Sequence, residues 1–172
     1  MSATIYVIDT SYLVEIADCD GRSHPKAVKE IRKRFKREAS RSARFFVSLP
    51  SVFELGNHIA NVKNASRRAK LAEWLLSTVQ SSLKDRMPWC ITPAGKPEDI
   101  LPELMDRFVP LAAKRKVGLV DTFTIAEAER LKQRHSGARP KVHIWTNDGN
   151  LKDYEPDKEP DAFLWKADGS RR

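Results

Sequence analysis

The stretch Thr4-Ile5-Tyr6-Val7-Ile8-Asp9-Thr10-Ser11 decides how the rest of the chain is interpreted. From Ile5 to Ile8 every side chain is apolar or aromatic, which is typical of a strand buried on both faces of a parallel sheet. A carboxylate, Asp9, ends this run, and two hydroxyl residues follow it. We therefore predict a buried strand over 4–8 with a polar group at its carboxyl end.

Strand and helix patterns alternate along the remainder of the sequence. Further strands are predicted over 44–48 and 141–145, and a short edge strand over 88–92, where prolines flank the run. Apolar residues at helical spacing predict helices over about 11–17, 24–40, 50–62, 98–114 and 121–136, and a long helix that starts after residue 64. Such alternation indicates a three-layer α/β/α domain with a central parallel sheet.

Length and composition limit the class of protein. The 172 residues suit a single domain, which we place at 1–154, including a basic helical segment at 22–44. Residues 155–172, acidic at first and interrupted by two prolines, are assigned to a C-terminal tail. No run approaches the roughly 18 apolar residues of a membrane span. Two cysteines form no disulfide framework, so we expect a cytoplasmic protein without a membrane segment.

The positive charge is concentrated in one segment. The chain carries a net charge of +8, and the stretch from Arg22 to Arg44 contains ten basic and two acidic residues, a surplus equal to that of the whole chain. Three interpretations stay open for this predicted helix: a solvated surface helix, a phosphate-binding face for nucleic acid, or a membrane-surface helix. On the second interpretation the RNA-binding residues are Arg32, Lys33, Arg34, Lys36 and Arg37.

Four carboxylates follow predicted strand ends, where ligands bind in α/β sheets. They are Asp9, Glu54, Asp121 and Asp148. Each has an ordinary structural explanation: Asp9 and Asp121 as helix N-caps, Glu54 in a capping box with Ser51, and Asp148 with Gly149 as a turn pair. Together they favour a divalent-metal site, because converging carboxylates repel one another unless cations neutralise them. Oxygen ligands alone suit Mg²⁺ or Mn²⁺ rather than Zn²⁺.

Four short motifs give the chain a resemblance to the PIN-domain ribonucleases, and among them to VapC-like toxins of type II toxin–antitoxin systems. The motifs are Tyr6-Val7-Ile8-Asp9-Thr10-Ser11, Leu49-Pro50-Ser51-Val52-Phe53-Glu54-Leu55, Leu119-Val120-Asp121-Thr122-Phe123-Thr124-Ile125-Ala126 and Ile144-Trp145-Thr146-Asn147-Asp148. The resemblance implies a PIN-like, Rossmann-like sheet, a Mg²⁺- or Mn²⁺-dependent endoribonuclease and a homodimer. Asp9, Glu54, Asp121 and Asp148 would be its acids. Thr10, Ser11, Thr146 and Asn147 would support them.

The combined prediction is an endoribonuclease in which metal-activated water cleaves RNA, acting as the toxin of a toxin–antitoxin pair with a cognate antitoxin as partner. A PIN nuclease of RNA processing is an alternative. A second alternative is an inactive PIN module that only binds nucleic acid. A phosphotransfer enzyme using Asp9 as nucleophile is less favoured, because Ser11 occupies the position where such enzymes carry a second aspartate.

Overall fold

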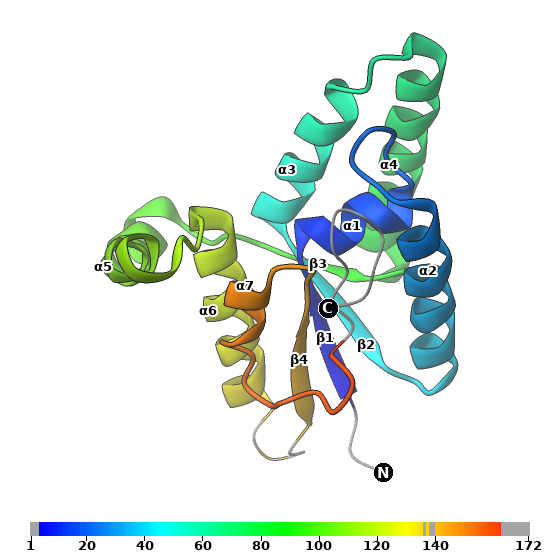
Figure 1. The fold of residues 1–172 in the computed structure, drawn as a ribbon. Helices are drawn as coiled ribbons and strands as arrows, with labels where there is room; N and C mark the ends of the chain where they lie inside the picture. The colour runs from blue at the N-terminus through cyan, green and yellow to red at the C-terminus, as the bar shows by residue number, and fades with distance from the viewer. Residues whose placement is uncertain (1–3, 136, 138–139, 163–172) are drawn as a thin grey trace.

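Four parallel strands form the central sheet of the protein. The computed structural model describes residues 4–135, 137 and 140–162. The strands are β1 (Thr4–Ile8), β2 (Arg44–Ser48), β3 (Cys90–Thr92) and β4 (Lys141–Trp145), in the spatial order β3-β2-β1-β4 (Figure 1). The prediction of a parallel sheet is therefore confirmed. The strand predicted over 88–92 is an edge strand as expected, but its pairing with β2 begins only at Cys90.

Helices precede or follow every strand. They are α1 (Thr10–Ala17), α2 (Pro25–Ser40), α3 (Leu49–Ala60), α4 (Ala65–Asp85), α5 (Pro97–Arg115), α6 (Leu119–Arg134) and α7 (Gly149–Lys152). The short α7 was not predicted, and it begins at Gly149, which the sequence placed in a turn pair with Asp148. None of the described helices is both long enough and apolar enough to cross a membrane.

Two apolar cores, one on each face of the sheet, establish the three layers. Successive strand residues point to opposite faces. Tyr6 and Ile8 of β1 pack with α1, α2, α3 and α4 in one core, while Ile5 and Val7 pack with α6 in the other. Helices on both sides of the sheet are visible in Figure 1. Three-layer α/β/α architecture is thus confirmed.

The segment 153–162, which we name the strap, covers the free edge of β4. The backbone N–H of Val142 donates to Oδ2 of Asp157 at 2.7 Å, and that of Ile144 donates to Oε2 of Glu155 at 3.3 Å. Carboxylates thereby satisfy two backbone donors of an edge strand that would otherwise be open to pairing with another chain. Residues 155–162 of the predicted tail lie against the domain in this way, whereas residues 163–172 fall outside the described residues.

Candidate active site

The sheet order brings three of the predicted acids to one edge. Asp9 directly follows the central strand β1, Asp148 follows its neighbour β4, and Glu54 lies in α3 after its other neighbour β2. The carboxyl ends of parallel strands lie at the same edge of a sheet, where such folds bind their ligands. The fold therefore explains why side chains far apart in sequence are neighbours.

Asp9 is the buried centre of this group, with 4% of its surface exposed. It is the N-cap of α1, as the structural explanation predicted, and accepts the backbone N–H of Ser11 at 3.2 Å. The hydroxyls of Ser11 and Thr146 also donate to its Oδ2, at 2.8 and 3.0 Å. Burial raises the pKa of Asp9, and these hydrogen bonds oppose the rise because they stabilise the carboxylate.

The predicted supporting residues connect β1 to the chain after β4. The Ser11 hydroxyl accepts the backbone N–H of Asn147 at 2.9 Å, and the Thr146 hydroxyl accepts that of Asp148 at 3.0 Å. Asp148 in turn caps α7 by accepting the N–H of Asn150. The Thr146 hydroxyl thus links the side chain of Asp9 to the backbone of Asp148.

Glu54 is tied to the site by Thr10, whose hydroxyl donates to its Oε2 at 2.5 Å. The predicted capping box of Ser51 and Glu54 is wrong. Ser48 is the N-cap of α3, and it accepts the backbone N–H of Ser51 at 3.3 Å. The helix begins earlier than expected, so Glu54 lies beyond its first turn and is available to the site.

Asp121 does not follow a strand, which corrects the sequence prediction. The helix α6 begins at Leu119 and its N-cap is Gly118, so Asp121 is the third residue of the helix rather than its cap. Its Oδ2 accepts the backbone N–H of Gly118 at 3.0 Å. The pKa of Asp121 is raised to about 6, first by burial, then by the charge of Asp9 and, more weakly, by those of Asp148 and Glu54.

The four carboxylates are thus close enough to act on one another electrostatically. They present only oxygen donors, which suit Mg²⁺ or Mn²⁺. In the part of the chain that the structure describes, no three Asp, Glu, His or Cys side chains are close enough together to bind an ion directly. The site therefore matches a divalent cation in charge and donor chemistry, although three of these side chains do not meet around one point.

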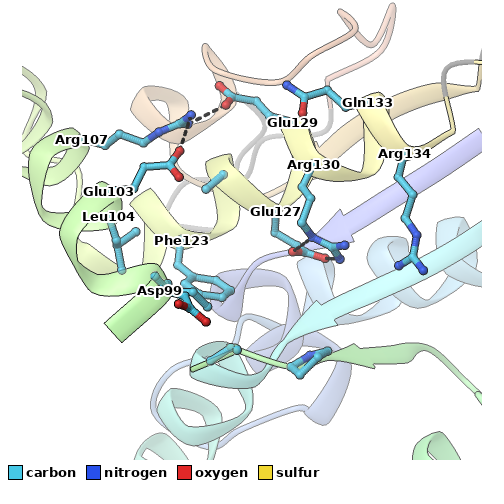
Figure 2. Close-up of a pocket in the computed structure, with 15 residues that line it drawn as sticks. Asp99, Glu103, Leu104, Arg107, Phe123, Glu127, Glu129, Arg130, Gln133 and Arg134 are labelled. Atoms are coloured by element: carbon cyan, nitrogen blue, oxygen red, sulfur yellow. Dashed lines mark hydrogen bonds and ion pairs between the residues drawn. The ribbon is translucent and has the colours of Figure 1, made fainter. Parts of the chain in front are cut away.

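A hollow between α5 and α6 contains ion pairs that the sequence analysis missed (Figure 2). Arg107 of α5 contacts Glu103 at 3.1 Å and Glu129 of α6 at 2.6 Å, and Arg130 contacts Glu127 at 2.6 Å. The pairs within each helix follow the spacing of three or four residues that was visible in the sequence. The pair of Arg107 with Glu129 was not visible in the sequence, because it depends on how α5 packs on α6.

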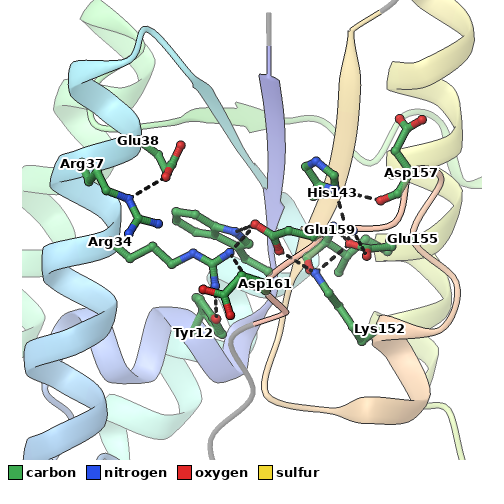
Figure 3. Close-up of polar contacts among 12 residues, drawn as sticks. Tyr12, Arg34, Arg37, Glu38, His143, Lys152, Glu155, Asp157, Glu159 and Asp161 are labelled. Atoms are coloured by element: carbon green, nitrogen blue, oxygen red, sulfur yellow. Dashed lines mark hydrogen bonds and ion pairs between the residues drawn. The ribbon is translucent and has the colours of Figure 1, made fainter. Parts of the chain in front are cut away.

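Arg34, predicted to bind RNA, lies in the interior instead (Figure 3). Its side chain is 6% exposed and forms an ion pair with Glu159 of the strap. Its guanidinium also lies over the Trp145 ring, 5.0 Å from the centroid. Glu159 contacts Lys152 at 2.8 Å, so one carboxylate bridges two buried cations. Arg34 can be buried because Glu159 neutralises its charge. Helical periodicity placed Arg34 on the polar face of the helix and does not reveal this distant acid.

The other predicted RNA-binding residues of α2 are exposed. Arg32 donates twice to the Ile16 carbonyl, at 3.0 and 2.7 Å, and Arg37 pairs with Glu38 at 2.8 Å. Lys33 and Lys36 complete the exposed set. Of the apolar residues at helical spacing in α2, Val28 and Ile31 are buried, whereas Ala39 is exposed and the acidic Glu38 is buried.

Comparisons with known proteins give a likeness to a solved structure but none to a family model. No protein-family model matches the chain, and no curated protein gives a significant match. The crystal structure of FitAcB from Neisseria gonorrhoeae is similar over 87% of this chain and 91% of that chain, with a TM-score of 0.49 and 16% sequence identity. The function is therefore inferred below from the residues of the site.

Proposed function

We propose that this protein is a metal-dependent endoribonuclease of the PIN-domain class. The observation that carries the proposal is the pKa of Asp121, which burial and the charges of Asp9, Asp148 and Glu54 raise to about 6. Negative charges gathered around one carboxylate, as around Asp121, are costly unless a cation neutralises them. The order of the four acid motifs along the sequence supports the same class.

The residues proposed to bind Mg²⁺ or Mn²⁺ are Asp9, Glu54, Asp121 and Asp148. A divalent cation bound there would lower the pKa of a bound water molecule and neutralise charge that develops on the scissile phosphate. The neighbouring hydroxyls hold two of the carboxylates in place: Ser11 and Thr146 donate to Asp9, and Thr10 donates to Glu54. With this arrangement no side chain of the protein has to act as the nucleophile.

Cleavage of single-stranded RNA is the direct test of this proposal. We expect the wild-type protein to cut RNA in Mn²⁺ and to stop when a chelator is added. Asp9→Asn and Asp121→Asn should each lower the cleavage rate at least about a hundredfold while the circular dichroism spectrum stays unchanged. Such losses are expected where charged groups at a reacting centre are removed.

The control variant is Asp106→Asn, which removes an exposed carboxylate of α5 outside the site. It should cleave RNA at the wild-type rate. Full activity in both Asp9→Asn and Asp121→Asn would overturn the proposal. RNA binding without cleavage by the wild-type protein in Mn²⁺ would favour the inactive binding module.

We propose further that the nuclease is the toxin of a toxin–antitoxin pair, acting as a homodimer. Expression in a bacterial host should then arrest growth, and co-expression of the protein encoded beside it should restore growth. A nuclease of RNA processing would cleave RNA in vitro without arresting growth. The Asp9→Asn variant serves as the control, because it should leave growth unaffected.

A further inference from the structure

Three hollows that share lining residues follow one another along α6 as far as the edge of the sheet, and we name them together the α6 groove. Its first hollow is almost wholly apolar and includes Pro50, Leu119 and Val120, so it begins at the residue directly before Asp121. It shares Leu104 and Phe123 with the hollow between α5 and α6 shown in Figure 2. The apolar hollow thus begins next to Asp121 along α6, although none of the four acids lines the three hollows.

The groove ends in a hollow with a strongly cationic lining. It shares Arg130 and Arg134 with the hollow between the helices, and Figure 2 shows both side chains extending from α6 in the direction of the strands. The strand residue Arg44, the α4 cap residue Arg86 and His135 complete its basic lining. No carboxylate is among the residues that line this end.

Three of these arginines are available to a ligand. Arg44, Arg86 and Arg134 are exposed, and none of them forms an ion pair within the described residues. The Arg44 guanidinium stacks on the Phe46 ring, 5.3 Å from its centroid. Arg130 differs from them, because Glu127 accepts two hydrogen bonds from it, at 2.8 and 2.6 Å. Stacked or exposed guanidinium groups are suited to phosphate oxygens, which they bind with paired donors.

The middle of the groove is better suited to bases than to phosphates, because its four carboxylates outnumber the two arginines, Arg107 and Arg130, that pair with them. Four carboxylates line it, and three of them form ion pairs: Glu103 and Glu129 with Arg107, and Glu127 with Arg130. Apolar side chains, among them Phe123, lie beside these pairs. Sequence-tolerant binding of single strands commonly combines a basic channel with apolar or aromatic contacts to the bases.

We propose that the α6 groove binds single-stranded RNA, with its backbone phosphates on Arg44, Arg86 and Arg134 and its bases over the apolar part. The inference rests on the proposed nuclease function, since it assigns the path by which substrate reaches the acids. From Val120 to Arg134 the helix rises about 21 Å, the length of roughly six stacked nucleotides. The groove lies on the face of the sheet opposite α2, so it is a different surface from the predicted basic helix.

The test is RNA binding by the triple variant Arg44→Gln/Arg86→Gln/Arg134→Gln, measured by fluorescence anisotropy in chelator so that no cleavage occurs. With a single strand of about twelve nucleotides, we expect affinity to fall about tenfold or more. The slope of log affinity against log salt should become shallower by about 2, since three phosphate contacts are lost. A strand of about three nucleotides can still reach the three arginines, which line one hollow, so it should lose affinity by a similar factor.

The matched control is Lys63→Gln/Lys70→Gln/Lys158→Gln, which removes the same charge from exposed lysines outside the groove. Equal affinity and salt slope in the triple variant and this control would overturn the α6 groove as an RNA site. Displacement of RNA by oligoglutamate of equal charge, as effectively as by unlabelled RNA, would also overturn it in favour of an acidic protein partner.

The two proposals fail in different ways. If the triple variant loses RNA affinity but the wild-type protein does not cleave RNA in Mn²⁺, the groove stands and the nuclease proposal fails. If the wild-type protein cleaves RNA and the triple variant binds it like the control, the nuclease stands and the groove fails.

Discussion

Three carboxylates at the candidate site each perform a structural and an electrostatic task. Asp9, Asp121 and Asp148 accept backbone N–H groups at the start of a helix, from Ser11, Gly118 and Asn150 respectively. Such contacts satisfy backbone donors that a helix start leaves unpaired. They also fix each carboxylate in place. Helix capping and cation binding are therefore not competing explanations here, because the caps orient the side chains that the cation would need.

The raised pKa of Asp121 predicts an unusual dependence of stability on pH. Its pKa is about 6 in the folded protein against an ordinary 3.8. Between these values the native state binds more protons than the unfolded state, so this group makes stability fall as pH rises from about 4 to about 6. The full shift corresponds to about 3 kcal/mol, and partial exposure of the side chain reduces the expected effect to about 1–3 kcal/mol.

Urea unfolding in chelator at several pH values checks this prediction. The free energy of unfolding of wild type minus that of Asp121→Asn should decrease by about 1–3 kcal/mol from pH 4 to pH 7, because only wild type ionises at this position. The free energy of unfolding of wild type minus that of Asp106→Asn should not change between pH 4 and pH 7. A difference for Asp121→Asn that is equal at both pH values would contradict the electrostatic coupling of the four acids.

At the scale of an element, the strap covers the open edge of β4, as a further strand of the sheet would. Its acids do more than accept N–H groups from β4. Glu155 accepts a hydrogen bond from Lys152, and this contact, with that of His143, lowers its pKa although burial opposes the change. Glu159 joins the strap to α2 through Arg34. The strap thus connects the edge strand β4 with the helix α2.

Removing the charge of Glu159 should destabilise the fold. In Glu159→Gln, Arg34 loses its buried carboxylate and Lys152 loses one of two, so we expect a loss of about 3–5 kcal/mol in the free energy of unfolding. The control is Glu103→Gln. It breaks the ion pair of Glu103 with Arg107 at the surface, where the Glu103 side chain is 72% exposed. It should cost no more than about 1 kcal/mol. Similar losses in both variants, measured by urea unfolding, would show that the buried cluster does not stabilise the strap.

At the scale of the whole molecule, most elements could be predicted because each is encoded locally. The strands 4–8, 44–48 and 141–145 agree with the structure, since continuous β-branched and aromatic runs mark a buried parallel strand. The order of the strands could not be predicted, because local patterns do not say which strands pair. For the same reason the sequence did not reveal the ion pair of Arg34 with Glu159. The two residues are far apart in the chain, and no local pattern links them.

The candidate site was predictable to a similar extent. All four acids were found from the sequence, and Asp9, Glu54 and Asp148 lie at or soon after strand ends as expected. Asp121 was assigned to a strand end that does not exist, because Val117-Gly118-Leu119-Val120 is apolar and β-branched enough to suggest a strand. Only the packing of α6 on the sheet brings its carboxylate to the others.

Calorimetric titration of the protein with Mn²⁺ tests most directly whether these four carboxylates form one cation site. The account predicts saturable binding by wild type and by Asp106→Asn, and loss of that binding in Asp9→Asn and in Asp121→Asn. Mn²⁺ binding of equal affinity in all four proteins, or in none of them, would contradict it.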